Sequence, residues 1–309
     1  MNKLFSTLKT PTLERWLAAT NSDGVPSEAY AIETRIVRDN SGKSSYCFGA
    51  ILNSYRFQRP QSKPGDRDCF LCEAVEDMSS EDSIQNLFPE YILLDFVVRP
   101  NKFPVTKGAS VAISNGIGNN ERPMYTTKDL ERVATEINEF AKFAKNTGFQ
   151  FFHNSPGFGA SISRHEHWHL TDFGIVYDKL GSTYGFDSAD RKPIKGSQVS
   201  FMPDFPFAHL IFNEGEPEKI VYLLEKLEKE IGPIFKGVGV PHTLSQGRSG
   251  ILVVPAKIYK EKGIGSGDVA GHLVFKSQDE FEKADYDSCI KKLSEVLFTK
   301  DELNLERFL

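Results

Sequence analysis

The sequence predicts an α+β fold in which antiparallel sheets are flanked by helices. Short apolar runs rich in β-branched and aromatic residues predict strands, and two long stretches with a 3.6-residue apolar period predict helices. The order strand, helix, strand, strand occurs twice along the chain, which indicates two related halves. The length of 309 residues and 39% hydrophobic content allow one large domain or two small ones.

The first repeat of this order lies between residues 91 and 171. The segments 91–100 and 109–114 are predicted to be strands, the first ending at Pro100. Residues 126–148 predict a helix, with Thr126 or Thr127 as N-cap and Gly148 as the stop. A strand over 149–154, a glycine-rich turn and a returning strand through the histidines complete this repeat.

The second repeat begins with a predicted strand at 207–213. The helix predicted over 216–232 has Pro217 near its start and Gly232 after its end. Further strands are expected at 249–257 and 271–277. One last helix is expected over 277–298, opened by a capping-box pattern at Ser277 and Glu280.

The overall composition excludes several classes of protein. A net charge of −5 and a pI of about 5.9 argue against a broad nucleic-acid-binding surface. Four cysteines in a chain of this length do not make a disulfide framework. No leading apolar segment and no 18-residue apolar run are present, so we expect a soluble cytoplasmic protein with no membrane span and no nucleic-acid partner.

Three of the seven histidines alternate in the segment "RHEHWHL", residues 164–170. On a β-strand His165, His167 and His169 share one face, because successive side chains alternate. Such a row suits either a zinc site completed by water or a catalytic imidazole flanked by two others. The preceding turn "NSPGFGAS", residues 154–161, favours attack on phosphorus, because glycines let backbone N–H groups approach an anion and serines add donors.

These residues carry a resemblance to a known family. The Asn154 turn and His165-x-His167-x-His169 resemble the histidine-triad superfamily. The spacing from Asn154 to His167 and the segment "RPNKFPV" (99–105) resemble its galactose-1-phosphate uridylyltransferase branch, which includes diadenosine tetraphosphate phosphorylases and GDP-hexose phosphorylases. "RDCFLCEA" (67–74) and "GDVAGHLVFKSQDEFEKA" (267–284) are further islands of similarity. The resemblance implies two histidine-triad-like halves, a catalytic one over residues 1–200 and a non-catalytic one over 201–309.

The resemblance also implies a reaction in two steps. His167 attacks the α-phosphorus of an NDP-sugar or dinucleoside polyphosphate and becomes a nucleotidyl-histidine. A phosphate or sugar-phosphate acceptor, or water, then takes the nucleotidyl group. His169, Ser161 and Ser163 are the expected donors to the phosphoryl oxygens. His165 is expected to fix the ring of His167 or to bind metal.

The other site residues follow from the same resemblance. Asn101, Lys102, Phe103 and Pro104 match the base- and ribose-binding stretch, and Asn154 and Gly159 belong to the phosphate-binding turn. The Cys-x-x-Cys pair, Cys69 and Cys72, has a spacing suited to structural zinc, with His165 as a further ligand and His153 as a substitute for a missing histidine. The branch implies no organic cofactor, and homodimerisation is common in it.

Other interpretations stay open at this point. The branch usually has glutamine where this chain has His169, as in the smaller hydrolases of the superfamily, so a hydrolase releasing a nucleoside monophosphate is the first alternative. A non-catalytic nucleotide-binding or zinc-stabilised protein and a metal-dependent hydrolase are the others. The segment "HTLSQGRSG", residues 242–250, suits either a ligand-binding loop or an ordinary hairpin, and His242 and His272 suit structural roles.

Overall fold

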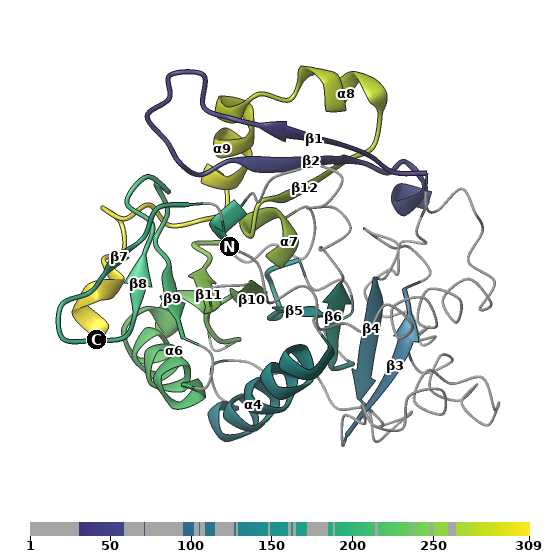
Figure 1. Cartoon of the computed structure of the whole chain (residues 1–309). Coiled ribbons are helices and arrows are strands. Elements are labelled where there is room, and N and C mark those ends of the chain that lie inside the picture. The colour runs from purple at the N-terminus through teal and green to yellow at the C-terminus, as the bar shows by residue number, and fades with distance from the viewer. Residues whose placement is uncertain are drawn as a thin grey trace.

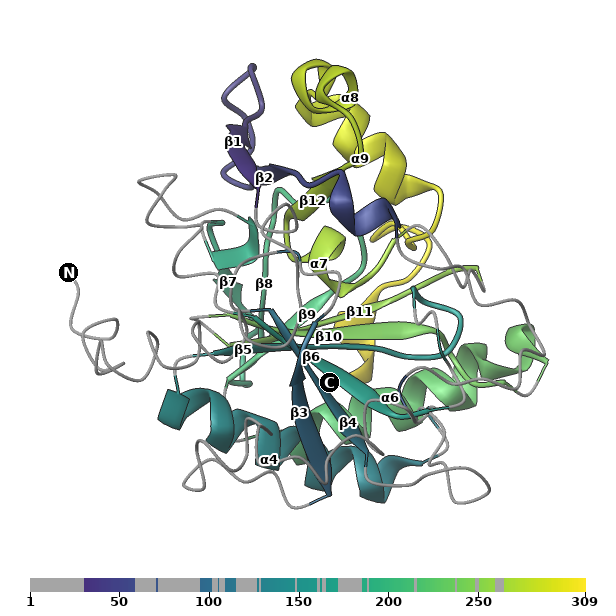
Figure 2. The same ribbon diagram turned by 90° about the vertical axis from the view of Figure 1, so that its right-hand side faces the viewer.

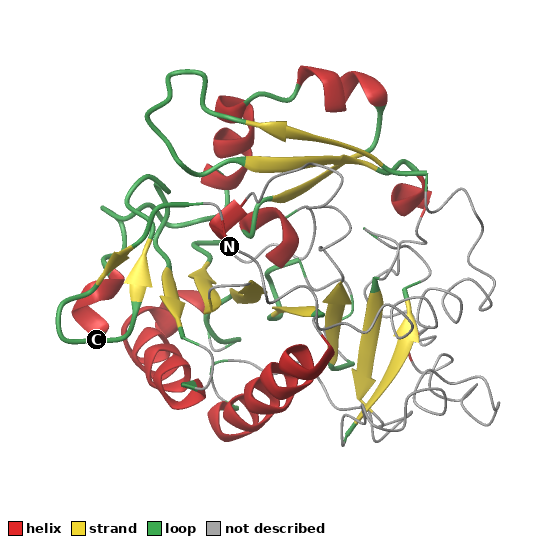
Figure 3. Ribbon diagram, viewed as in Figure 1, coloured by secondary structure: helices red, strands yellow, loops and turns green. Residues whose placement is uncertain are grey.

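The computed structural model has an α+β fold in three layers, which confirms the predicted fold class (Figures 1 and 3). The structure describes residues 31–58, 71, 95–101, 105, 109–114, 127, 129–147, 149–159, 162, 165–171, 185–187, 189–213, 216–236, 238–247, 250–258 and 264–309. A nine-stranded sheet forms the middle layer, two long helices cover one of its faces, and a smaller sheet with short helices covers the other (Figure 2).

The nine-stranded sheet has the strand order β3-β4-β6-β5-β10-β11-β9-β8-β7, and every pair in it is antiparallel. Its strands are β3 (Phe96–Pro100), β4 (Ser110–Ser114), β5 (Gln150–Asn154), β6 (His167–Thr171), β7 (Lys192–Pro193), β8 (Ser200–Phe201), β9 (Leu210–Phe212), β10 (His242–Gly247) and β11 (Gly250–Pro255).

The strand order repeats about the middle of this sheet. β4, α4 (Leu130–Thr147), β5 and β6 follow one another in the first half, and β9, α6 (Pro217–Ile231), β10 and β11 follow in the second. Each half places its strands in the same relation, as β4-β6-β5 and as β9-β11-β10, and the halves join at β5 and β10. β11, the counterpart of β6, reads GILVVP and carries no histidine. The division at residue 200 stays a prediction.

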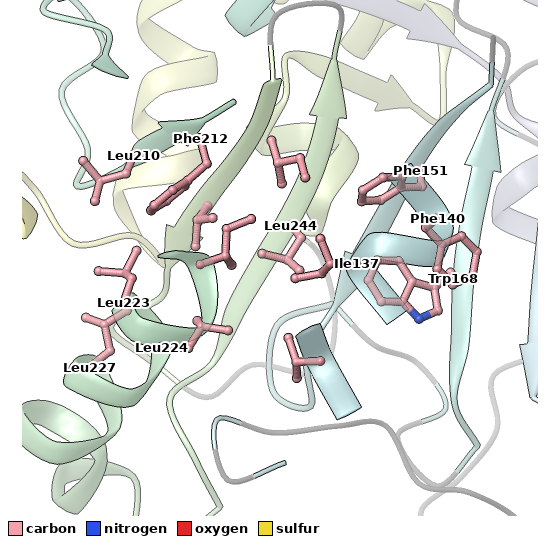
Figure 4. Close-up of a cluster of buried hydrophobic side chains, with 14 of the residues drawn as sticks. Ile137, Phe140, Phe151, Trp168, Leu210, Phe212, Leu223, Leu224, Leu227 and Leu244 are labelled. Carbon is pink, nitrogen blue, oxygen red and sulfur yellow. The ribbon is translucent and has the colours of Figure 1, made fainter. Parts of the chain in front are cut away.

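The helix-facing side of the sheet holds a core shared by both halves. α4 and α6 pack against each other and against apolar side chains that alternate along the strands. Figure 4 shows Trp168 beside Phe140 and Phe151, and Leu244 between that group and the leucines of α6. The rings of Trp168 and Phe140 are stacked, with centroids 4.4 Å apart. This contact fixes the strand that carries the histidines onto α4.

The opposite face is covered by a three-stranded sheet of β1 (Glu33–Val37), β2 (Phe48–Leu52) and β12 (His272–Phe275). β12 runs parallel to β2, so it is an exception to the antiparallel prediction. α7 (Ser266–Val269), α8 (Gln278–Lys283) and α9 (Tyr286–Ser294) complete this layer. A second core cluster fills the space between the layers. The 3-10 helices are η2 (Tyr55–Gln58), η6 (Gly185–Asp187), η7 (Gly232–Phe235) and η8 (Leu305–Phe308).

Most predicted elements are present, with several differences. The predicted single helix over 277–298 is two helices, because Asp285 caps α9 and Arg35 binds carbonyl oxygens at the end of α8. The predicted strand at 91–100 is a strand only from Phe96, and 91–94 lie outside the described residues. The strands β1, β2, β7 and β8 were not predicted, and β10 only as one side of a possible hairpin. The predicted strand at 271–277 is β12 of the three-stranded sheet, so the prediction that it completes the second repeat is wrong, and β10 takes that place. Within the described part of the chain, no helix has the length and apolar character needed to cross a membrane.

Candidate active site

Strand β6 lies between β4 and β5, so the histidines sit within the sheet rather than at its edge. Its register pairs His169 with Phe152 of β5, and His167 with Ile113 of β4. Trp168 and Leu170 belong to the helix-facing core, while Phe152 belongs to the cluster on the opposite face. By strand alternation, His167 and His169 therefore face the layer that contains α7 and β12.

His165 does not belong to this strand, which begins at His167. The predicted strand therefore includes His167 and His169, while His165 lies two residues before its start. Its ring is fully buried, and its Nε2 donates a hydrogen bond to the backbone oxygen of Ser114, at 2.9 Å. The Ser114 backbone N–H donates in turn to the backbone oxygen of Glu166, at 3.0 Å. Among the described residues, these two bonds are the last ones between β4 and the segment that leads into β6.

The His167 ring is held in one tautomer. Its Nδ1 lies 2.9 Å from the backbone oxygen of His165, which can only accept, so Nδ1 carries the proton. The lone pair of the neutral ring is then on Nε2, the atom that a nucleophilic imidazole uses. The His169 ring stands edge-to-face to it, with centroids 5.4 Å apart. His167 is 5% exposed and His169 is partly exposed, so the pair lies at the edge of solvent.

The same local bond occurs at two other histidines. Nδ1 of His209 lies 2.6 Å from the Phe207 oxygen, and Nδ1 of His242 lies 2.9 Å from the Val240 oxygen. At His209, Nε2 accepts a hydrogen bond from the Met202 backbone N–H, so both ring nitrogens are hydrogen-bonded to buried backbone groups. The Nδ1 bond is thus a general way of fixing a strand histidine here. At His167 the ring of His169 also lies edge-to-face against it, and Asn154, which begins the glycine turn, ends the neighbouring strand β5 on the same side.

Asn154 ends β5 on the side of His167. Its Oδ1 accepts a hydrogen bond from the Ser266 backbone N–H, at 2.6 Å, and lies 3.4 Å from the Thr243 hydroxyl, which donates its proton to the His153 backbone oxygen at 2.9 Å. A backbone N–H can only donate, so the Ser266 bond identifies which end of the amide is oxygen. The Nδ2 donor therefore occupies the other end. The segment from Ile264 to Ser266 thus orients an amide at the candidate site.

The glycines of the turn have a structural reason within the chain. Gly157 and Gly159 have φ of 79° and 72°, in the left-handed region that favours glycine. A Cβ at Gly159 would lie 2.5 Å from the Ile264 oxygen and 2.9 Å from the Gly265 Cα. The turn therefore packs directly against the 264–265 backbone. Its role as a phosphate-binding turn stays a prediction, and Ser161 and Ser163 lie outside the described residues.

A buried polar cluster lies on the other face of the same strand. The Glu166 carboxylate accepts from Arg132 of α4 and from His153 Nε2 of β5, each at 3.0 Å. Burial lowers the pKa of His153 well below its usual value, and the Arg132 charge adds to this effect. The ring is therefore neutral and donates its Nε2 proton to the carboxylate. No pattern in the sequence predicts this cluster, apart from the strand alternation that puts Glu166 on the face opposite the histidines.

The remaining predicted residues are only partly described. Asn101 follows β3, and its backbone N–H donates to the Ala109 oxygen at 2.9 Å. Because Pro100 pairs with Ser110 and Ser110 with Leu170, Asn101 lies beyond the Leu170 end of β6, whereas Asn154 lies at the His167 end. Lys102, Phe103, Pro104, Cys69 and Cys72 are outside the described residues.

The predicted zinc ligands include one described residue, His165. Its Nε2 carries the ring proton, because it donates to the Ser114 backbone oxygen. A metal would therefore have to bind at Nδ1. Among the residues that the structure describes, no group of three His, Cys, Asp or Glu side chains could hold a metal ion. The predicted set of Cys69, Cys72 and His165 stays a prediction, because both cysteines fall outside that part.

Comparison with known proteins shows that the fold is shared with solved structures. No family model matches the chain, and no curated protein matches its sequence. Solved structures of a nucleotide phosphorylase do match: the yeast Ap4A phosphorylase Apa2 has a TM-score of 0.60 at 14% identity, covering 95% of each chain. Its complex with Ap4A has a TM-score of 0.57 at 15% identity, covering 95% of this chain and 98% of that one. Its complex with AMP gives 0.57 at 15%, covering 93% and 97%.

Proposed function

We propose that this protein is a nucleotidyl-transferring enzyme that cleaves a phosphoanhydride bond through a covalent nucleotidyl-histidine on His167. The observation that carries the proposal is the bond from His167 Nδ1 to the His165 carbonyl, which assigns the ring lone pair to Nε2. The fold shared with an Ap4A phosphorylase supports the substrate class, a dinucleoside polyphosphate or an NDP-sugar. By the resemblance in sequence, the reaction belongs with the galactose-1-phosphate uridylyltransferase branch.

In the first step the Nε2 lone pair of His167 forms a bond to the α-phosphorus. The bond from that phosphorus to the bridging oxygen breaks, and its electron pair leaves with the departing phosphate. The Nδ1 proton stays in place, so the ring becomes cationic as the bond forms. The His165 carbonyl stabilises this cation, because it accepts the Nδ1 proton's hydrogen bond throughout. In the second step the acceptor's oxygen attacks phosphorus and returns the lone pair to Nε2.

Two neighbouring side chains suit the phosphoryl oxygens and the leaving group. His169, whose ring contacts that of His167, would donate a proton or hydrogen bond to the departing oxygen. Asn154 would donate from Nδ2, since its Oδ1 accepts from the Ser266 backbone N–H. Donors aimed in advance at developing negative charge are a large source of rate enhancement.

The second candidate function is a hydrolase that uses water as the acceptor. His169 favours it, because an imidazole can act as a general base toward water in the second step, whereas the glutamine usual in the transferase branch cannot. Both functions share the covalent first step. They differ only in whether phosphate or a sugar phosphate raises the rate of the second step.

The test is intact-protein mass spectrometry after mixing with a panel of UDP-, GDP- and ADP-sugars and diadenosine tetraphosphate. We expect one added nucleotidyl group in the wild type and none in His167→Ala, with His242→Asn as a matched control outside the site. Release of monophosphate without an adduct, unaffected by added phosphate, would favour the hydrolase. No adduct and no turnover with any donor would contradict the proposal and leave a nucleotide-binding protein.

Structural zinc is a further part of the proposal, with Cys69, Cys72 and Nδ1 of His165 as ligands. When bound there, zinc would supply folding free energy rather than a catalytic step. Metal content measured on the purified protein and on Cys69→Ser tests it. We expect about one zinc per chain in the former, and its loss together with a lower melting temperature in the latter.

A further inference from the structure

The side of the catalytic strand that faces α4 carries a buried ionic cluster that the proposed reaction does not use. We call it the Glu166 cluster, formed by Glu166, Arg132, His153 and Glu136. The side chains of Glu166 and His153 are fully buried, and that of Arg132 is 25% exposed. Glu166 binds Arg132 through one carboxylate oxygen and His153 through the other. The carboxylate is therefore held from α4 and from β5 at once.

The cluster also holds the residue after the nucleophile. Arg132 Nε lies 3.5 Å from a carboxylate oxygen of Glu136, and the other oxygen of Glu136 accepts from Trp168 Nε1 at 3.1 Å. Glu166 and Trp168 lie on either side of His167 in the chain. The two neighbours of the nucleophile are thus both tied to α4 through one set of charges.

The peptide group that orients His167 lies between these anchors. The His165 carbonyl, which accepts from His167 Nδ1, belongs to the peptide bond that joins His165 to Glu166. On one side of this peptide the His165 ring donates to the Ser114 backbone oxygen. On the other side the backbone oxygen of Glu166 accepts from the Ser114 backbone N–H. The Glu166 side chain adds a charged anchor to these bonds. A rotation of this peptide would have to pull the carboxylate from Arg132 and His153.

Stability alone does not account for such a cluster. Burying a carboxylate and a guanidinium costs several kcal/mol of desolvation, and well-packed apolar residues often serve a core as well or better. The His153 ring that binds Glu166 lies against Trp168, with centroids 4.5 Å apart, and Trp168 stacks on Phe140, so the cluster borders an aromatic core. A charged anchor offers something an apolar one does not, which is a fixed direction for the attached backbone.

We infer that Glu166 is a positioning residue for the nucleophile: its carboxylate, held by Arg132 and His153, fixes the peptide whose carbonyl keeps His167 in the Nδ1–H tautomer. This inference rests on the proposed function for its kinetic consequence only. The tautomer itself is a property of the resting protein. Nothing in it requires Glu166 to touch substrate, since its carboxylate lies on the face of the sheet opposite His167.

The test uses Glu166→Gln, Glu166→Ala and Arg132→Met in the full chain. We expect kcat to fall about 10- to 100-fold in Glu166→Ala, as small misplacements of reacting groups do, with KM little changed. Glu166→Gln keeps an acceptor for one partner, so it should recover part of the loss. Arg132→Met leaves His153 as the remaining partner of the Glu166 carboxylate. Its kcat should therefore lie between that of the wild type and that of Glu166→Ala. If Glu166→Ala does not fold, the other two variants carry the same comparison.

The second measurement is the tautomer of His167 by ¹⁵N NMR, its signals assigned by their absence in His167→Gln. We expect the Nδ1–H form in the wild type and a mixture of the two tautomers in the Glu166 variants. Arg35→Met is the control, because Arg35 anchors the distant α8 through the Phe281 and Ala284 oxygens and its loss destabilises without touching β6.

Two results would overturn the inference. One is an unchanged tautomer in Glu166→Ala and Glu166→Gln. The other is a fall in kcat that Arg35→Met reproduces at equal loss of stability. A wild type that forms no adduct and turns over no donor would instead refute the proposed function, and the NMR comparison would still decide the role of Glu166.

Discussion

Gly159 shows how one residue joins two distant parts of the chain. Its φ of 72° already disfavours any side chain, and its Cα faces the Ile264 oxygen so closely that a Cβ would lie 2.5 Å away. Gly42 has nearly the same φ, 67°, but a Cβ there would meet nothing within 4 Å. Alanine substitutions at the two glycines therefore distinguish the cost of a left-handed backbone from the cost of steric overlap.

We expect Gly42→Ala to lower the free energy of unfolding by about 1 kcal/mol, the cost of a left-handed alanine. Gly159→Ala should carry that cost and a further 1–3 kcal/mol, roughly, because the 264–265 backbone has to move. Urea unfolding of both variants measures the difference. Equal losses would mean that the turn and the C-terminal segment are not in contact.

At the scale of an element, α7 and the residues before it behave as a support for the end of β5. The Ser266 N–H fixes Asn154 Oδ1, and a Cβ at Gly265 would lie 3.2 Å from Asn154 Nδ2. Two residues on, a Cβ at Gly267 would have its nearest neighbour, the His272 oxygen, at 3.8 Å, which is an ordinary contact. The same segment thus offers a tight position and a relaxed one.

We predict that Gly265→Ala displaces the Asn154 amide and raises KM for the donor of the proposed reaction about 10-fold, the loss of one good hydrogen bond. Gly267→Ala should leave KM within about twofold. Steady-state kinetics with the donor found by mass spectrometry measure both. Equal KM values in the two variants would remove Asn154 from the substrate site.

The elements that could be predicted from the sequence are those set by neighbouring residues. The periodicity of α4 and α6 and the alternation of β6 are local, so the helices and the shared face of His167 and His169 were predicted correctly. The break between α8 and α9 was missed although one of its causes is local, the Asp285 cap that bonds Ser288; its other cause is distant, since Arg35 is 249 positions from Ala284. The parallel pairing of β12 with β2 also joins distant parts of the chain.

Within the site the same distinction holds. The histidine row and the glycine turn are visible as a short pattern of letters. The partners that orient them are not: Ser266 is 112 positions from Asn154, and Arg132 is 34 from Glu166. The sequence of a glycine-rich turn is also the same whether its backbone approaches an anion or another segment of the chain. The sequence therefore predicts which residues carry the chemistry, while the fold determines which atoms they present.

Over the described part of the molecule, neutral histidines are buried in or beside both sheets. Burial lowers the pKa of His209 and of His272 to about 3 and that of His242 to about 4, in each case mainly because the charged ring would lose its hydration. His209 has a further reason, since its Nε2 accepts the Met202 N–H and can take a proton only by giving up that bond. In the unfolded chain all three titrate near 6.5.

The sign of the pH dependence follows from these values. Between about pH 6.5 and pH 4 the unfolded chain binds a proton at each of the three histidines and the folded protein does not. The free energy of unfolding is therefore fully retained above pH 6.5. Below it, each histidine removes about 1.4 kcal/mol per pH unit, until the pH reaches its folded pKa. We expect a steep loss of stability on mild acidification, well before carboxylates are protonated.

His272→Phe isolates one of these contributions. The His272 ring already stands edge-on to Phe152, with centroids 6.0 Å apart, so a phenyl ring suits the position and does not titrate. Urea unfolding at pH 7.5, 6.5, 5.5 and 4.5 should show a slope below pH 6 that is smaller in the variant by about 1.4 kcal/mol per pH unit. Above pH 7 the two stabilities should differ by an amount independent of pH. Parallel curves throughout would mean that His272 takes up its proton in the folded protein, and that its environment admits water.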